Sequence, residues 1–225
     1  MTAPLVFTAV ALGRRTARTL TFEVPPRETV AVLGDEGSGV GLLGGYALGL
    51  ERLASGRVTV YGTVIADLPE RERLAFRRQV GYLPAGDGLL QNLSLRDNVA
   101  LPLRFGSAAS LREIEGRVNV MLAAVRVAAV GHRRPAEVNE EERRRAAFAR
   151  AMAFDPALLV LEQPFDGLTA RAASELLEFA RGGETAEGAR RTILITGQEL
   201  PSMVHRRIER TYRLTRAGTL ELEPA

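Results

Sequence analysis

The sequence contains no cysteine and no lysine, and its only histidines are His132 and His205. The absence of cysteine excludes a disulfide scaffold and a thiolate metal site, and two histidines argue against a metal site built from imidazole ligands. No apolar run reaches the 18 or more residues that a membrane-spanning helix needs. The apolar residues 4–12 precede their nearest arginines, whereas a secretory signal carries its charge first. This order favours a first strand over an export signal.

Because lysine is absent, all 30 basic residues are arginine, and 27 acidic residues leave a formal net charge of only +3. The arginines are scattered, with short clusters at 143–145 and 206–207. This pattern favours a solvated arginine face over a nucleic-acid-binding surface. A chain of 225 residues with 46% hydrophobic residues is long enough for one large domain with a substantial core.

The segment Val30 to Leu50 combines a short apolar run, a glycine-rich turn and an apolar helix-like tail. This order of strand, glycine loop and helix is typical of a phosphate-binding loop, whose template is Gly-x-x-x-x-Gly-Lys-Ser/Thr. The template glycines are kept, but its lysine is replaced by valine and its hydroxyl residue by glycine. The remnant of the nucleotide-binding loop consists of Gly34, Gly37, Ser38, Gly39, Val40 and Gly41.

Short apolar runs alternate with helical patterns along the rest of the chain. An antiparallel hairpin is expected from residues 4–12 and 18–24, with its break near Gly13-Arg14-Arg15, and a second hairpin closes the chain at 207–222. The other expected strands are 29–33, 56–62, 80–83, 157–161 and 192–196; the expected helices are 39–50, 68–78, 93–105 (interrupted by Pro102), 111–125, 139–154 and 169–181. A glycine-rich loop is expected from Gly182-Gly183 to Gly188. This alternation predicts an α/β fold with a mainly parallel sheet covered on both faces.

Four stretches carry a resemblance to a known family: FEVPPRETVAVLG, ALGLERLASGRVTVYG, LLQNLSLRDNVALPL and RRRAAFARAMAFDPALLVLEQPF. The order of these landmarks resembles the ATP-binding subunit of ABC transporters, especially its lipoprotein-export, cell-division and MCE-associated lipid-trafficking branches. The resemblance implies a P-loop NTPase-like ABC ATPase fold over residues 1–225 as a single domain. It also implies an N-terminal antiparallel β-subdomain and a helical subdomain at about residues 84–140.

Every position that carries chemistry in this family differs here. The aromatic residue that stacks on adenine matches Leu12, and the lysine and hydroxyl of the loop match Val40 and Gly41. The remaining matches are Ala85 for the Q-loop glutamine, Glu162 for the Walker B aspartate, Gln163 for the catalytic glutamate, Thr169 for the D-loop aspartate and Gly197 for the switch histidine. The signature Leu-Ser-Gly-Gly-Gln/Glu matches Val138, Asn139, Glu140, Glu141 and Glu142.

These replacements remove the groups that phosphoryl transfer needs, which are mainly cations and ligands that neutralise the transferring phosphate. Asn139 is a good N-cap, and the glutamates after it neutralise the helix dipole and repel a triphosphate. We therefore expect a catalytically inactive subunit without a cofactor. The alternative is a divergent ATPase that still binds ATP and Mg²⁺, with Glu162 facing the metal. A third reading, a free-standing adaptor or nucleic-acid binder, depends only on the arginines.

The resemblance also implies partners. They are an integral membrane permease, a second ABC ATPase-like subunit in a homodimer or heterodimer, and an MCE-type lipid-binding protein. The expected location is the cytoplasm, peripheral on the inner face of the membrane. The family receives its permease in a groove behind the Q-loop, and the matching apolar residues are Leu89, Leu90, Leu93, Val99 and Leu103.

Overall fold

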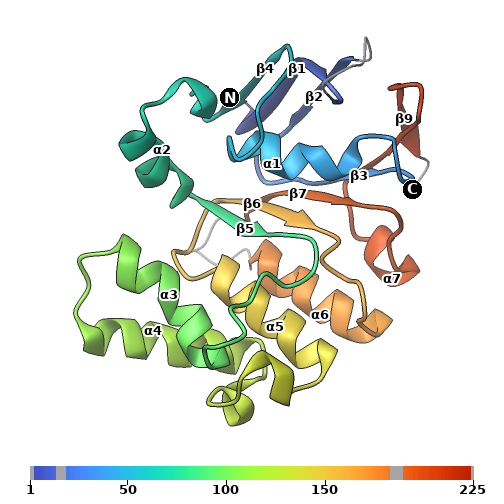
Figure 1. The fold of residues 1–225 in the computed structure, drawn as a ribbon. Helices are drawn as coiled ribbons and strands as arrows, with labels where there is room; N and C mark the ends of the chain where they lie inside the picture. The colour runs from blue at the N-terminus through green and yellow to red at the C-terminus, as the bar shows by residue number, and fades with distance from the viewer. Residues whose placement is uncertain (1–2, 14–18, 183–189, 224–225) are drawn as a thin grey trace.

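A computed structural model describes residues 3–13, 19–182 and 190–223. The predicted break at Arg14-Arg15 and most of the predicted loop from Gly182-Gly183 to Gly188 lie outside these ranges. The described chain forms two sheets with helices packed around them (Figure 1). This arrangement confirms the predicted α/β class.

The larger sheet has six strands in the order β5-β6-β7-β3-β8-β9. The first five strands are parallel and β9 is antiparallel to β8. The six strands are β3 (Thr29–Leu33), β5 (Val80–Leu83), β6 (Leu158–Glu162), β7 (Thr192–Gly197), β8 (Arg210–Leu214) and β9 (Leu220–Glu223). The smaller sheet is antiparallel, in the order β2-β1-β4, and contains β1 (Leu5–Ala11), β2 (Thr19–Val24) and β4 (Arg57–Val60).

The central strands bury both faces, and their residues alternate between two apolar clusters. Val30 and Val32 of β3 pack with α1 (Leu43–Ala47) and the smaller sheet, whereas Ala31 and Leu33 face the cluster between the sheet and the helices α5 (Glu140–Ala151) and α6 (Ala170–Arg181). Because side chains of a strand point alternately to opposite faces, one apolar run supplies both layers of the core. Figure 1 shows α1 above the larger sheet and α5 and α6 below it.

The helices are α1 (Leu43–Ala47), α2 (Glu70–Arg77), α3 (Leu95–Gly106), α4 (Leu111–Ala124), α5 (Glu140–Ala151), α6 (Ala170–Arg181) and α7 (Ser202–His205). Short 3-10 turns are η1 (Val40–Leu42), η2 (Ile65–Asp67), η3 (Ala128–Val130) and η4 (Pro135–Glu137). Helices α3 and α4 pack on each other and on α5. Their buried residues belong to the same apolar cluster as the lower face of the sheet.

Two helix predictions need correction. The helix expected over 39–50 is only η1 followed by five residues of α1, because Gly49 takes a left-handed conformation (φ 58°) that ends the helix. The helix expected to be interrupted at Pro102 is continuous through it. A proline costs an internal hydrogen bond. The Ser94 cap and the burial of Leu95 and Val99 stabilise the helix against that cost.

Candidate functional site

The predicted site residues after β3, β5, β6 and β7 gather at one edge of the larger sheet. These strands are parallel, so their carboxyl ends meet, which is where ligands bind in open α/β sheets. The amide of Gly34 donates to the carbonyl of Gly197 at 2.9 Å, and the amide of Gln163 donates to the carbonyl of Thr196 at 2.7 Å. The structure therefore brings together the positions that match the phosphate loop, the Walker B strand and the switch.

The loop from Gly34 to Gly39 is held by its glycines and by one buried hydroxyl. Gly37 and Gly39 adopt left-handed conformations (φ 82° and 95°), which glycine reaches without steric cost. Ser38 is fully buried, and its Oγ accepts a hydrogen bond from the amide of Val40 at 3.3 Å. The backbone conformation of a tight glycine turn is thus kept, although the lysine is missing.

Apolar side chains pack against this loop. Leu12, which matches the adenine-stacking position, is 3% exposed, and a Cβ at Gly39 would lie only 2.9 Å from its Cβ. Val40 is buried in the same apolar cluster as Leu12. Asp35 and Glu36 are exposed in the loop, so the loop itself contributes only carboxylates as charged groups. Gly41 is exposed and has open space where a side chain would begin.

Glu162 ends β6 as a buried carboxylate that other groups already hold. Its Oε2 accepts a hydrogen bond from the amide of Ala85 at 3.1 Å, and its side chain also bonds to Tyr82. Its Oε1 packs against Gly44, where a side chain would clash with the carboxylate. Burial raises the pKa of Glu162, and the hydrogen bonds from Ala85 and Tyr82 oppose this shift. Burial, followed by the charge of Glu162, raises the pKa of Tyr82.

Gln163 follows in a left-handed conformation (φ 46°), which is uncommon for a residue other than glycine. Gly197 lies beside it, and a Cβ at Gly197 would be 3.8 Å from the Cα of Gln163. An amide side chain at Gln163 has no carboxylate that could act as a base. Thr169 is the N-cap of α6, and its hydroxyl accepts a hydrogen bond from the amide of Ala172 at 3.2 Å.

The residues that match the signature lie at the start of α5. The Asn139 side chain accepts a hydrogen bond from the amide of Glu142 at 2.8 Å, and the Glu142 carboxylate accepts one from the amide of Asn139 at 3.0 Å. This capping box satisfies backbone donors of the first turn within the helix. Glu141 pairs with Arg145 at 2.8 Å, and the Glu140 carboxylate packs against Gly167. Val138 is half-buried ahead of the cap.

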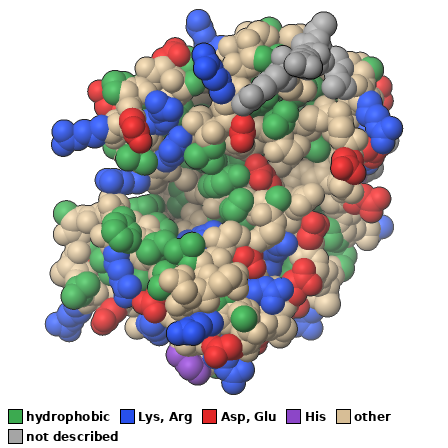
Figure 2. Space-filling view, in the orientation of Figure 1, with side chains coloured by type: hydrophobic (Ala, Val, Ile, Leu, Met, Phe, Trp, Pro, Cys, Tyr) green, Lys and Arg blue, Asp and Glu red, His purple; other side chains and the backbone are tan. Residues whose placement is uncertain are grey.

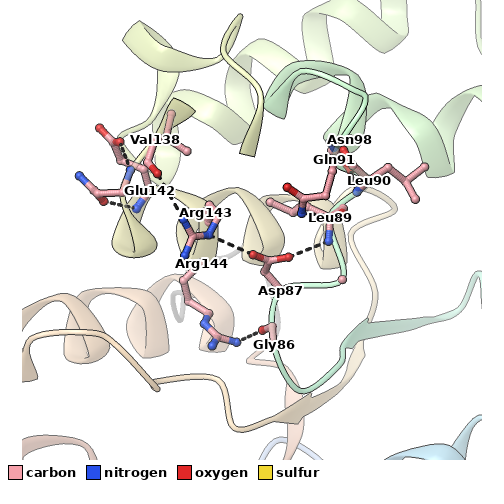
Figure 3. A network of polar contacts seen from close by, with 12 residues as sticks. Gly86, Asp87, Leu89, Leu90, Gln91, Asn98, Val138, Glu142, Arg143 and Arg144 are labelled. Carbon is pink, nitrogen blue, oxygen red and sulfur yellow. Dashed lines mark hydrogen bonds and ion pairs between the residues drawn. The ribbon is translucent and has the colours of Figure 1, made fainter. Parts of the chain in front are cut away.

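Arginines of α5 hold the loop that follows β5 (Figure 3). Arg143 pairs with Asp87 at 3.3 Å, and Arg144 donates to the carbonyl of Gly86. Arg150 donates to the carbonyls of Asp87 and Gly88 at 3.0 and 2.6 Å. The position of the Q-loop glutamine is thus part of a loop tied to the same helix as the signature position.

The prediction of a solvated arginine face is wrong for the cluster 143–145, because two of its three arginines are buried. Arg144 and Arg145 are 5% and 8% exposed. Arg145 pairs with Glu175 at 3.3 Å as well as with Glu141. The pair Glu141 and Arg145 has the i,i+4 spacing of a helix, but the contacts of Arg144 with Gly86 and of Arg145 with Glu175 have no local signal, because these partners come from the loop after β5 and from α6.

Three of the five residues expected to contact a permease belong to the core. Leu89, Val99 and Leu103 are buried, whereas Leu93 is half-buried and Leu90 is 45% exposed. Sequence analysis missed the buried Asn98 nearby. Its Oδ1 accepts a hydrogen bond from the amide of Leu90 at 2.7 Å, and its Nδ2 donates to the carbonyl of Leu90 at 3.0 Å. Asn98 therefore fixes the segment that leads into α3.

In the described parts of the chain, no three residues among His, Asp and Glu are grouped so that they could ligate a metal ion. Within the same residues, no helix has both the length and the apolar character needed to cross a membrane.

Three comparisons with known proteins agree on the family. The family model described as "ABC transporter" matches residues 17–166. The chain is 33% identical to the lipoprotein-releasing system ATP-binding protein LolD of Chromohalobacter salexigens, over 79% of this chain and 74% of that protein. It is also 33% identical to the sulfate/thiosulfate import ATP-binding protein CysA of Nocardia farcinica, over 72% of this chain but only 47% of that protein.

The fold is similar to that of the ATP-binding cassette MJ0796, solved as a dimer in a post-hydrolysis state bound to ADP and Pi. The TM-score is 0.84 at 20% identity, with 98% of this chain and 97% of that chain covered. The similarity to cbiO1 of Clostridium perfringens, part of the transporter complex cbiONQ, has a TM-score of 0.80 at 16% identity, over 98% of this chain and 87% of that one. These comparisons confirm the predicted ABC ATPase fold, and the chain belongs to the ABC transporter family.

Proposed function

We propose that this chain is a catalytically inactive ABC subunit that acts as a structural or regulatory partner of a membrane permease. The observation that carries the proposal is the glycine loop, where Leu12 and Val40 pack and where none of residues 34–41 is basic. A triphosphate needs positive charge at its β- and γ-phosphates, and this loop instead presents the carboxylates of Asp35 and Glu36.

The residues that would hold magnesium also do not fit magnesium-ATP. Gly41 has no hydroxyl to serve as a ligand, and Gln163 has no carboxylate. The carboxylate of Glu162 is engaged by Ala85 and packs on Gly44. We therefore expect neither ATP nor Mg²⁺ as a cofactor of this chain.

The start of α5 extends the same argument to a second subunit. In the family, this helix start faces the phosphates of a nucleotide that the partner subunit holds. Here the side chains of Asn139 and Glu142 each accept a hydrogen bond from the backbone amide of the other residue, and Glu140 and Glu141 add negative charge to the first turn. Because each composite site uses one loop and one signature, this chain would disable both sites in a homodimer and in a heterodimer.

The proposed partners follow from the family and from the names of the relatives. A permease would contact the region of about residues 84–140, which we regard as the helical subdomain, and Leu90 and Leu93 are the accessible members of the predicted set. A location on the inner face of the cytoplasmic membrane follows from such a complex. The sequence resembles the lipoprotein-export, cell-division and MCE-associated lipid-trafficking branches of the family, and one relative is named for lipoprotein release. On this basis we propose transport of lipid or lipoprotein, with an MCE-type protein as a further partner.

A second candidate is a divergent ATPase that still binds ATP. Two observations favour it: relatives at 33% identity are named ATP-binding proteins, and the glycine loop keeps its left-handed turns at Gly37 and Gly39. Backbone amides of such a turn can form an anion-binding nest.

Thermal unfolding with and without magnesium-ATP separates the two candidates. A ligand that binds only the folded state must raise the unfolding temperature. An inactive subunit should show no shift at millimolar magnesium-ATP and no phosphate release above a protein-free blank. A shift of several degrees with steady phosphate release from purified protein would favour the divergent ATPase, and a shift without release would show that nucleotide binding alone has survived. Co-purification with an integral membrane protein tests the permease half of the proposal.

A further inference from the structure

The segment of residues 85–90 connects β5 to α3 and crosses the front of the molecule in Figure 1. Four of its six residues are exposed: Ala85, Gly86, Gly88 and Leu90. Exposed connections of this kind are usually mobile. Here side chains from other parts of the chain form hydrogen bonds or ion pairs with five of the six residues, and the sixth, Leu89, is buried in the apolar core.

The carboxylate of Asp87 makes two contacts at the centre of this segment (Figure 3). Its Oδ2 pairs with Nε of Arg143 at 3.3 Å, and its Oδ1 accepts a hydrogen bond from the amide of Leu89 at 2.9 Å. One carboxylate therefore both shapes the segment and attaches it to α5.

Three arginines of α5 converge on this carboxylate. Arg143 is its ion-pair partner, and its charge also acts on Arg144 and Arg150. Arg144 donates to the carbonyl of Gly86 and has two further acidic neighbours, Asp166 and Glu140. Because hydrogen bonds from charged donors are stronger than those between neutral groups, α5 holds the segment mainly through charge.

The backbone turns on both sides of Asp87. Gly86 and Gly88 adopt left-handed conformations (φ 78° and 61°), which glycine reaches without steric cost. The carbonyls of Asp87 and Gly88 accept hydrogen bonds from Arg150 at 3.0 and 2.6 Å. Arg150 also lines a groove of about 410 Å³ between α2 and α3, which Figure 2 shows as a hollow in this side of the molecule.

We infer that residues 85–90 form a strap that opens and closes as one unit, and that the charge of Asp87 holds it closed. Opening would remove the amide of Ala85 from Glu162 and the carbonyl of Gly86 from Arg144, and these two charged side chains are only 8% and 5% exposed. Because a buried charge without its partner is costly, the contacts of the strap stabilise one another. Closing the strap requires neither a nucleotide nor a permease, so the strap does not depend on the proposed inactivity.

Hydrogen exchange of three backbone amides, measured by NMR on the full chain without nucleotide, tests the strap. The amides of Ala85, Leu89 and Leu90 donate to Glu162 Oε2, Asp87 Oδ1 and Asn98 Oδ1, at 3.1, 2.9 and 2.7 Å. All three lie outside the helices and strands, so their exchange reports local opening of the strap.

Asp87→Asn keeps an acceptor for the amide of Leu89 but removes the charge. It should speed the exchange of all three amides by about tenfold, although the acceptors on Glu162 and Asn98 are unchanged, because a hydrogen bond or ion pair of a charged group is lost. Arg143→Gln should act in the same direction, and Arg143→Lys, which keeps the charge, should restore part of the protection.

Two controls separate the strap from general effects. Arg104→Gln removes an exposed ion pair with Asp97 on α3 and should leave the three amides unchanged. Amides of the core strand β7 report opening of the whole fold, and Asp87→Asn should not accelerate them to the same extent.

Three results would overturn the strap: unchanged exchange in Asp87→Asn, faster exchange of Leu89 alone, or equal acceleration in β7. The first would show that the charge holds nothing, the second that the contacts are independent, and the third that the whole fold has loosened. None of these rates involves magnesium-ATP, so a chain with a cooperative strap that also hydrolysed ATP would refute inactivity and keep the strap.

Discussion

The carboxylate of Glu162 lies against Gly44, so that a side chain at Gly44 would force the carboxylate to move. The same carboxylate accepts the amide of Ala85 at 3.1 Å, which links β6 to the loop after β5. The carboxylate thereby joins α1, β6 and the loop, at the position that matches the family's Walker B aspartate.

The burial of Glu162 predicts a specific pH dependence of stability. Its pKa in the folded protein is raised above the ordinary value of 4.5, mainly by burial. As the pH rises above that value the unfolded chain ionises this group first, so the folded state is penalised and the free energy of unfolding falls. Glu162→Gln, which keeps one acceptor oxygen, should therefore gain stability relative to the original chain as the pH rises from about 4.5 to 7. Urea unfolding at several pH values measures this difference.

Glu115→Gln on α4 is the control, because Glu115 is exposed. Its stability difference from the original chain should not follow the same trend. If the difference for Glu162→Gln stays constant with pH, the carboxylate is ionised as easily as in water, and our account of its environment is wrong.

Restoring two groups of the glycine loop should restore binding without turnover. Val40→Lys with Gly41→Ser returns the cation and the hydroxyl, and the open space at Gly41 accepts the serine. Magnesium-ATP at about 100 times its dissociation constant would then stabilise the fold by about 2.7 kcal/mol, visible as a thermal shift. Phosphate release should remain at the blank, because Gln163 and the glutamates of α5 are unchanged.

The control protein, Val40→Leu with Gly41→Ser, has the hydroxyl but not the cation. Its unfolding temperature should not rise with magnesium-ATP. Turnover by the Val40→Lys, Gly41→Ser protein would contradict the roles assigned here to Gln163 and to the start of α5.

The capping box at α5 predicts a stability effect that can be measured without any ligand. Asn139→Ala removes the acceptor for the amide of Glu142 and should lower the free energy of unfolding by about 1 kcal/mol. Asn139→Ser keeps an acceptor and should cost only a few tenths of that amount. Chemical denaturation of the three proteins compares them. Equal stability of the alanine and serine variants would show that the cap contributes nothing.

Sequence patterns predicted the layered fold well where the signal is local. The strands at 29–33 and 80–83 have the predicted bounds, because each is an apolar run that glycine or proline ends. The helix expected over 39–50 was overestimated, since its many glycines shorten it, and the four-residue helix α7 was missed. Short elements such as α7 have too few turns to show a helical period.

The sequence predicted which residues occupy the site, but it did not predict which side chains pack against them. The resemblance to the family assigned Gly34, Gln163 and Gly197 to its motifs, and the structure places these residues at one edge of the sheet. The packing of Leu12 on Gly39 and the burial of Arg144 depend on residues far away in the sequence, and no local pattern encodes them. The inactivity of the site and the partners of the chain stay predictions.

Arg150 of α5 contacts two parts of the molecule at once. Its guanidinium lies in the groove between α2 and α3 and at the same time grips the carbonyls of Asp87 and Gly88. Arg150 thus ties the loop after β5 to the end of α5, so that a displacement of one would pull on the other.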